Sequence, residues 1–178
     1  MISVFEPLIT QDDIDEVVKA LKNGEISGSF GSSLNKFEKK FAAYCGCRYG
    51  IAVNSGTSAL QLAVRAAGIG PGDEVLVSSS TNIATALAAT HNGAIPVPVD
   101  SDKNTWNLDL NLVEKLITKK TKAIIPVHLY GLPVDMLKLN KIAKKYNLTV
   151  IEDCAESHGA KFKKKMTGSF GDMGCFSF

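Results

Sequence analysis

The sequence predicts an α/β fold in which a mostly parallel sheet is sandwiched between helices. Short apolar runs rich in Val and Ile alternate with amphipathic stretches of about ten residues, the pattern of strand–helix–strand units. The 178 residues suffice for one such domain with its own core and are too few for two comfortable ones. With 45% apolar and 21% charged residues, the composition is that of a globular chain and excludes disorder as a description of the whole.

Residues 1–24 are predicted to form an N-terminal helical segment, separate from a larger domain over 25–178. Thr10 is a plausible N-cap, apolar residues then recur at helical spacing, and Gly24 stops the run. A loop rich in Gly and Ser is expected over 25–33, followed by a second amphipathic helix over 34–44.

From residue 51 onward, strands and helices are predicted to alternate. The strands are expected at 51–53, 74–77, 95–99, 123–127, 149–151 and 175–178, and the helices at 58–67, 83–90, 109–117 and 133–146. Pro96 and Pro98 favour a sheet edge or a strand end for their strand. Pro133 suits the first position of its helix. The lysine-rich stretch 161–165 is expected to be a solvated hairpin.

The charge balance argues against several classes of partner. Twenty basic and eighteen acidic residues give a net charge of +2, so the sequence does not indicate binding to nucleic acid or to an anionic membrane. No apolar run approaches the roughly 18 residues of a membrane-spanning helix, and the N-terminus lacks the pattern of a signal peptide. The four cysteines are expected to be reduced thiols, and Cys45 and Cys47 lack the further ligands of a zinc site. A cytoplasmic protein without a metal is therefore expected.

The turn after the predicted 51–53 strand is a candidate phosphate-binding site. Residues 54–58 read Asn-Ser-Gly-Thr-Ser and open a helix, where free N–H groups and the helix dipole favour an anion. Gly56 would allow close approach of a ligand to the backbone. A simple Ser/Thr N-cap explains the same residues, and this alternative stays open.

Two acidic residues, Glu152 and Asp153, follow the predicted 149–151 strand. A carboxylate at a buried strand end must be paired, and a protonated heterocyclic nitrogen such as that of pyridoxal phosphate is one suitable partner. A helix cap or a solvated turn acid is the alternative. A nucleotide-binding oxidoreductase is opposed, because the glycines of 68–72 follow a helix and precede a strand, the reverse of a dinucleotide fingerprint.

Five ordered motifs carry a resemblance to a known family. They are VNSGTSAL (53–60), GPGDEV (70–75), AIIPVHLYG (123–131), IEDCAESHGA (151–160) and GSFGDMGCFSF (168–178). In this order they resemble the DegT/DnrJ/EryC1/StrS sugar aminotransferases, over nearly the whole chain from about residue 25. The resemblance implies the large domain of a fold-type-I transferase that depends on pyridoxal 5'-phosphate.

The resemblance also implies roles for six residues. Asp153 would pair with the pyridine nitrogen, and Glu156 would lie next to the phenolic oxygen of the cofactor. The phosphate would be held by Gly56, Thr57 and Ser177. Asn82 stands where many members have an aromatic residue that stacks on the pyridine ring, so polar contacts would have to replace the stacking.

For the function, the resemblance implies transfer of an amino group, with glutamate as the expected donor, to a nucleotide-linked keto-deoxysugar, in the biosynthesis of amino sugars and cell-surface polysaccharides. It also implies a homodimer. The Schiff-base lysine would fall just past Phe178, so the chain is expected to be a truncated piece without that lysine and without the small C-terminal domain, and by itself inactive. A sugar dehydratase of the same family, with histidine in place of the lysine, and a non-catalytic binding or regulatory protein remain alternatives.

Overall fold

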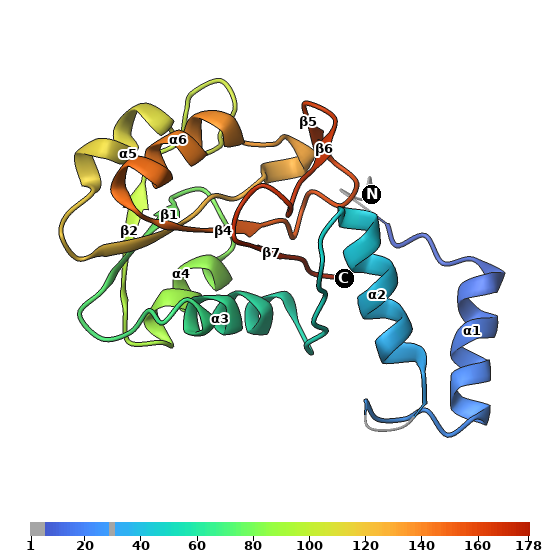
Figure 1. Cartoon of the computed structure of the whole chain (residues 1–178). Helices are drawn as coiled ribbons and strands as arrows, with labels where there is room; N and C mark the ends of the chain where they lie inside the picture. The colour runs from blue at the N-terminus through green and yellow to red at the C-terminus, as the bar shows by residue number, and fades with distance from the viewer. Residues whose placement is uncertain (1–5, 29–30) are drawn as a thin grey trace. The chain divides into compact units, whose positions relative to one another are not determined.

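A computed structural model describes residues 6–28 and 31–178 of the chain (Figure 1). Residues 1–5 of the predicted N-terminal segment and residues 29–30 of the predicted 25–33 loop lie outside the described residues. The chain divides into two compact units. The first consists of the described residues of Met1–Ala43 and Arg48–Ala52, and the second of Tyr44–Cys47 and Val53–Phe178.

The first unit contains helix α1 (Gln11–Lys22) and most of helix α2 (Ser33–Cys45). Thr10 and Asp13 form a reciprocal capping box at the start of α1, so the predicted N-cap is confirmed. Gly24 follows the helix with a φ of +72°, a conformation that glycine adopts without steric cost. The predicted stop at Gly24 is thereby confirmed as well.

The second unit is built on a five-stranded sheet whose pairings are all parallel, in the order β2-β1-β3-β4-β7 (Figure 1). The strands are β1 (Glu74–Ser78), β2 (Ile95–Val99), β3 (Thr121–Ile125), β4 (Thr149–Asp153) and β7 (Met173–Cys175). Pro96 and Pro98 lie on β2, one of the two edge strands of this sheet, where one side needs no ladder hydrogen bonds. The predicted parallel α/β fold and the edge position of this strand are confirmed.

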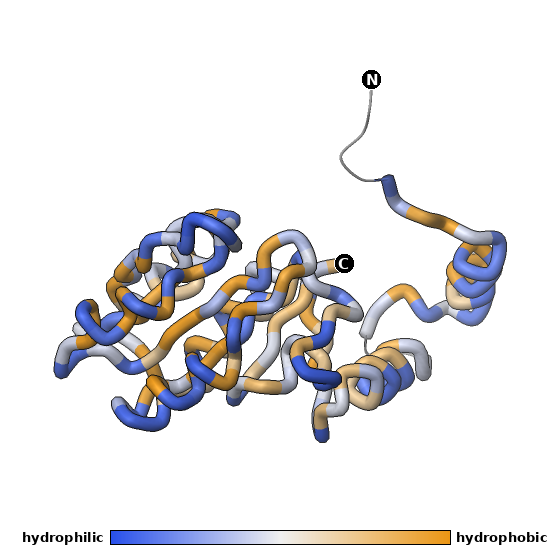
Figure 2. The backbone as a smooth tube through the Cα atoms, turned by 90° about the horizontal axis from the view of Figure 1, so that it is seen from above, coloured by the Kyte–Doolittle hydropathy of each residue, from blue (hydrophilic) through white to orange (hydrophobic). Residues whose placement is uncertain are grey.

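Helices cover both faces of the sheet. The helices are α3 (Gly56–Ala66) and α4 (Ile83–Thr90) on one face, and α5 (Leu110–Leu116) and α6 (Met136–Tyr146) on the other. Alternation along β1 supplies both cores, because Val75 and Val77 pack toward α3 and α4 whereas Leu76 packs toward α5 and α6. Figure 2 shows hydrophobic stretches along the strands between helices that carry residues of both kinds.

A short hairpin and a one-turn helix complete the second unit. Strands β5 (Lys161–Phe162) and β6 (Lys165–Met166) pair antiparallel around Lys163 and Lys164, which both have positive φ. This is the predicted 161–165 hairpin. The 3₁₀ helix η1 (Leu129–Gly131) follows β3.

Most predicted elements are shifted by one or two residues at an end, and three predictions were wrong in a way that has a clear physical reason. Residues 51–53 form no strand, since Ile51 is 75% exposed and the segment has no partner in the sheet. Pro133 does not begin its helix, because Asp135 caps it by accepting a hydrogen bond from Lys138 N, and the helix starts at Met136. The terminal strand is Met173–Cys175 rather than 175–178, because its partner β4 ends opposite Cys175.

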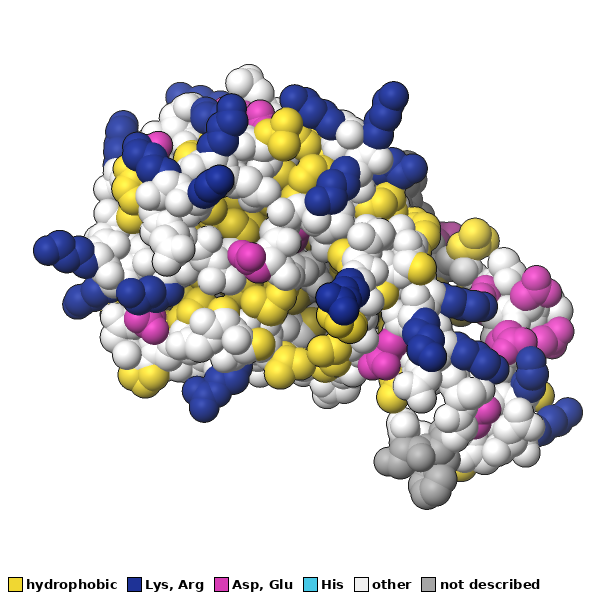
Figure 3. Space-filling view, in the orientation of Figure 1, with side chains coloured by type: hydrophobic (Ala, Val, Ile, Leu, Met, Phe, Trp, Pro, Cys, Tyr) yellow, Lys and Arg dark blue, Asp and Glu magenta, His cyan; other side chains and the backbone are white. Residues whose placement is uncertain are grey.

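Among the described residues, no helix combines the length and the apolar character needed to cross a bilayer. On the face drawn in Figure 3, Lys and Arg side chains lie among hydrophobic, acidic and other polar groups.

Candidate functional site

The carboxyl end of β4 presents two buried carboxylates to opposite faces of the sheet. Successive side chains of a strand alternate between faces, so Glu152 lies on the side of Val150 and α6, and Asp153 on the side of Ile151 and α4. Glu152 is 0% and Asp153 4% exposed. This burial excludes the solvated turn acid that the sequence had left open.

Asp153 is held by two donors. Thr85 of α4 donates its hydroxyl hydrogen to Oδ2 at 2.8 Å, and the N–H of Ala155 donates to Oδ1 at 3.2 Å. Burial raises the pKa of Asp153 above its ordinary value, although the hydrogen bonds from Thr85 and Ala155 work in the opposite direction. A buried carboxylate of this kind gains from a cationic partner.

Glu152 accepts four hydrogen bonds. The N–H groups of Phe170 and Gly171 donate to Oε1 at 2.6 and 2.7 Å, while Gly168 N and His128 Nε2 donate to Oε2 at 2.9 and 3.0 Å. Burial alone would raise the pKa of Glu152, but the bonds from His128, Gly171 and Gly168 outweigh it and lower that pKa. We call this arrangement the Glu152 junction. It fastens the 168–171 segment, which leads into β7, to β4.

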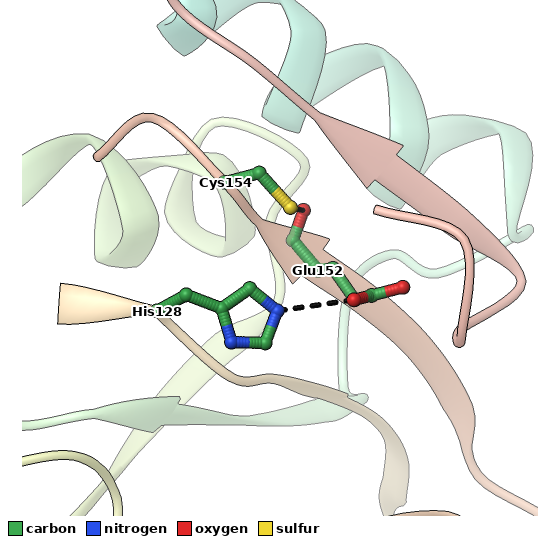
Figure 4. A group of neighbouring side chains, drawn as sticks. All are labelled: His128, Glu152 and Cys154. Carbon is green, nitrogen blue, oxygen red and sulfur yellow. Dashed lines mark hydrogen bonds and ion pairs between the residues drawn. The ribbon is translucent and has the colours of Figure 1, made fainter. Parts of the chain in front are cut away.

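His128, Glu152 and Cys154 lie close enough together to raise the question of a metal ion (Figure 4). The donors counted above fill the four lone-pair sites of the carboxylate. His128 Nδ1 accepts from Val134 N at 3.1 Å, so Nε2 carries the proton that is donated to Glu152. Burial also raises the pKa of the Cys154 thiol well above its ordinary value, which disfavours the thiolate that binds metals. The cluster fits a structural junction better than a metal site.

The first turn of α3 is the candidate phosphate site. Ser55 is the N-cap, and its hydroxyl accepts from Ser58 N at 3.2 Å. The Ser/Thr N-cap that the sequence left open as an alternative is therefore present. The cap satisfies one of the donors of the first turn. The N–H groups of Gly56 and Thr57 precede the first intrahelical bond and have no protein acceptor within the described residues. The cap therefore leaves two N–H groups of this turn available to an anion.

Ser177 lies directly against Gly56. A Cβ atom placed on Gly56 would be 2.7 Å from Ser177 Cβ and 3.1 Å from its Oγ, distances that leave no room for a side chain. Two residues before Ser177, Cys175 pairs with Asp153 across β4 and β7. We call the first turn of α3 together with Ser177 the cradle. Since two extended residues span about 7 Å, the cradle lies close to Asp153.

The structure gives the other two predicted residues definite local partners. Asn82 is exposed and caps α4, with its Oδ1 accepting from Ala84 N at 3.0 Å. Glu156 is exposed three residues after Asp153, and its Oε2 accepts from Tyr130 N at 2.9 Å. Binding of a cofactor by Asn82 and Glu156 stays a prediction.

Thr85 bonds Asp153 and His128 bonds Glu152, and neither partner was predicted from the sequence. Both are fully buried polar side chains. A threonine in an otherwise apolar helix, Ile-Ala-Thr-Ala-Leu-Ala-Ala, is the signal that would have indicated a buried polar partner for Thr85.

These residues fit the chemistry of pyridoxal 5'-phosphate. Gly56, Thr57 and Ser177 offer N–H and hydroxyl donors at a helix N-terminus, with a close approach that only glycine permits. Asp153 offers a buried carboxylate to a protonated ring nitrogen. The free N–H groups of the first turn of α3 and the Asp153 carboxylate lie together at the carboxyl edge of a parallel sheet, where such folds bind ligands.

Known proteins resemble the chain along nearly its whole length. GDP-perosamine synthase of Caulobacter vibrioides is 50% identical over 99% of this chain and 47% of its own length. dTDP-3-amino-3,6-dideoxy-alpha-D-galactopyranose transaminase of Aneurinibacillus thermoaerophilus is 52% identical over 92% of this chain and 46% of its own length. The chain thus spans about half the length of the relatives it matches.

Solved structures give the same result. The aminotransferase of Psychrobacter cryohalolentis superimposes with a TM-score of 0.94 at 41% identity, over 97% of this chain and 44% of that one. The PLP form of the sugar aminotransferase Spr1654 of Streptococcus pneumoniae, described as putative, superimposes with a TM-score of 0.87 at 35% identity, over 97% of this chain and 47% of that one. A family model matches residues 7–178, and the chain therefore belongs to the DegT/DnrJ/EryC1/StrS aminotransferase family.

Proposed function

We propose that this chain supplies the cofactor-binding part of a pyridoxal-phosphate aminotransferase that acts on a nucleotide-linked keto-deoxysugar. The observation that carries the proposal is the placement of Gly56 against Ser177 at the start of α3, next to the strand that ends in the buried Asp153. The names of the two relatives, a GDP-sugar synthase and a dTDP-sugar transaminase, support a nucleotide sugar as the acceptor.

Each residue contributes a separate part of the work. Gly56, Thr57 and Ser177 hold the phosphate and so fix one end of the cofactor. Asp153 keeps a proton on the ring nitrogen, and Glu156 orients the phenolic oxygen. When bound, the cofactor supplies an electron sink for breaking a bond at the amino-bearing carbon. Thr85 and the Glu152 junction keep Asp153 and the Ser177 segment in place.

The amino donor is an amino acid such as glutamate, and the product is an amino sugar used in polysaccharide synthesis. We place the protein in the cytoplasm, in keeping with the free thiols of its four cysteines. A homodimer and a division into residues 1–24 and a cofactor-binding domain from residue 25 complete the proposal.

Transfer of a labelled amino group tests this function. The protein that contains this chain is incubated with pyridoxal 5'-phosphate, ¹⁵N-glutamate and a GDP- or dTDP-linked keto-deoxysugar, and the sugar product is analysed by mass spectrometry. We expect ¹⁵N to appear in the sugar. Loss of a hydroxyl group from the sugar without gain of nitrogen would instead identify the dehydratase, and no change with either nucleotide would contradict the proposal.

A further inference from the structure

Helix α4 contains two threonines that use their hydroxyl groups in different ways. Thr90 Oγ1 donates to Leu87 O at 3.2 Å, within its own helix, as helical threonines commonly do. Thr85 makes no such bond. Its hydroxyl hydrogen goes to Asp153 Oδ2 at 2.8 Å, on a strand 68 residues further along the chain.

The hydroxyl group of Thr85 also contacts a second hydroxyl group, that of Thr81. Thr81 Oγ1 lies 2.7 Å from Thr85 Oγ1. A hydroxyl has one hydrogen, and that of Thr85 is donated to Asp153, so Thr81 must be the donor in this pair. The direction of the chain is therefore Thr81 to Thr85 to Asp153, with each donor polarised by the next.

We propose that Thr85 is a positioning residue for the cofactor, which, with Thr81 behind it, holds the Asp153 carboxylate ionised and in a fixed orientation toward the ring nitrogen. The inference rests on the proposed cofactor site. Thr85 occupies one lone pair of Oδ2 and Ala155 N one lone pair of Oδ1. One lone pair remains on each oxygen, and the carboxylate cannot rotate without breaking both bonds.

The backbone around Asp153 is fixed as well. Asp153 N donates to Pro126 O at 2.9 Å, and Cys154 N donates to Cys175 O at 2.8 Å. With the backbone held, only the side-chain torsions of Asp153 remain free to change, and the bond from Thr85 restricts them. The ionisable groups that act on Asp153 are Glu156, which disfavours the charged carboxylate, and His128, which favours it only when both ring nitrogens are protonated. The Cys175 thiol, opposite Asp153 in the register, also faces it.

The test begins with the chain free of cofactor. The pKa of the Asp153 side chain is measured by NMR on protein with a ¹³C-labelled aspartate carboxyl group. Thr85→Val keeps the shape of the buried side chain and removes the donor, so we expect the pKa of Asp153 to rise further. Thr85→Ser should restore it, because the hydroxyl returns. Thr90→Val is the matched control in the same helix, and it should leave this pKa unchanged.

Binding of pyridoxal 5'-phosphate provides the second readout. We expect Thr85→Val to raise the dissociation constant about tenfold, as for the loss of one hydrogen bond to a charged group, and Thr85→Ser to bind nearly as the wild type does. Thr81→Val should shift both readouts in the same direction but less, which keeps the test available if Thr85→Val does not fold.

The possible failures are distinguishable. An Asp153 pKa that is the same in wild type, Thr85→Val and Thr81→Val would overturn the role of the threonines, while leaving the proposed function intact if the wild type binds the cofactor. An equal shift in Thr90→Val would overturn it too. A wild-type chain that shows the threonine effect but does not bind pyridoxal 5'-phosphate would contradict the proposed function, and with it the role toward the ring.

Discussion

Gly56 and Ser177 are 121 positions apart in the chain and touch at the first turn of α3, where a Cβ on the glycine would lie 2.7 Å from that of the serine. The contact depends on β7, which pairs with β4 and brings residue 177 to the start of the helix. The helix N-terminus thus gains a hydroxyl beside its two free N–H groups. Two free N–H groups at a helix N-terminus with a hydroxyl beside them suit an anion.

Gly56→Ala should weaken binding of pyridoxal 5'-phosphate by at least about tenfold, because the added methyl group displaces Ser177 or fills the cradle. Stability should change little, since alanine favours the first turn of a helix and offsets part of the steric cost. Equilibrium titration followed by absorbance measures the affinity. Gly70→Ala is the control, because its Cβ would meet only Asn92 O at an ordinary 3.7 Å. Equal affinity of the two variants would contradict the assignment of Gly56.

Asp153→Asn should stabilise the chain at neutral pH while abolishing the pairing with a protonated ring. The pKa of Asp153 is raised above its ordinary value of 3.8 by burial, so the protein is most stable with this group protonated and loses stability as pH rises through the folded-state pKa. A neutral amide does not ionise, so Asp153→Asn should raise the free energy of unfolding at pH 7 by roughly 1 kcal/mol. The hydroxyl of Thr85 can rotate to accept from the amide and donate to Thr81, so the variant should fold.

Urea unfolding at pH 7 and at pH 3 measures this effect. The stabilisation by Asp153→Asn should be present at pH 7 and small at pH 3, where the carboxyl of the wild type is largely protonated as well. In the proposed aminotransferase, the same variant should lower amino transfer by orders of magnitude. A variant that transfers amino groups as fast as the wild type would remove Asp153 from the mechanism.

How far the sequence predicted this structure differs from element to element. The helix at 83–90 was predicted to the residue, because its stop at Asn92 and Gly93 and its apolar run are local signals. The 51–53 strand was wrong, because strand formation requires a neighbour that a three-residue pattern does not specify. The position of Ser177 against Gly56 follows from pairing between β4 and β7, which no local pattern encodes.

In the candidate site, too, residues with a local sequence signal were predicted and their distant partners were not. Asp153 was singled out from its place after an apolar strand, and its burial followed from that place. The partners Thr85 and His128 were missed, because their hydrogen bonds join residues 68 and 24 positions apart and depend on how α4 and the segment after β3 pack on the sheet.

Glu152→Gln should destabilise the fold by about 3 kcal/mol at pH 7. In the wild type, backbone N–H groups donate to both carboxylate oxygens of Glu152. Glutamine replaces one of these oxygens with an NH₂ group, which cannot accept, so the N–H donors on that side lose their acceptor. Urea unfolding measures the loss. Glu114→Gln, at an exposed carboxylate bonded to Lys145, is the control and should leave the urea midpoint nearly unchanged, because solvent screens an exposed ion pair.

The wild type should also lose stability in acid through Glu152. The pKa of Glu152 is lowered from its ordinary value of 4.5, so its contribution is fully present above 4.5 and is lost as pH falls through the lower folded-state value. Glu152→Gln should remove this part of the acid dependence. If Glu152→Gln and Glu114→Gln unfolded at the same urea concentration at pH 7, the junction would not be stabilising.

The most direct test of the account is to locate pyridoxal 5'-phosphate on the chain by ¹H–¹⁵N NMR titration. We predict that the largest shifts occur at the amides of Gly56, Thr57 and Ser177 and at Asp153, and that pyridoxal without its phosphate loses the shifts at Gly56 and Thr57. Shifts confined to other parts of the chain, such as the Lys161–Phe162 and Lys165–Met166 hairpin, or no saturable shifts at all, would contradict the proposed cofactor site.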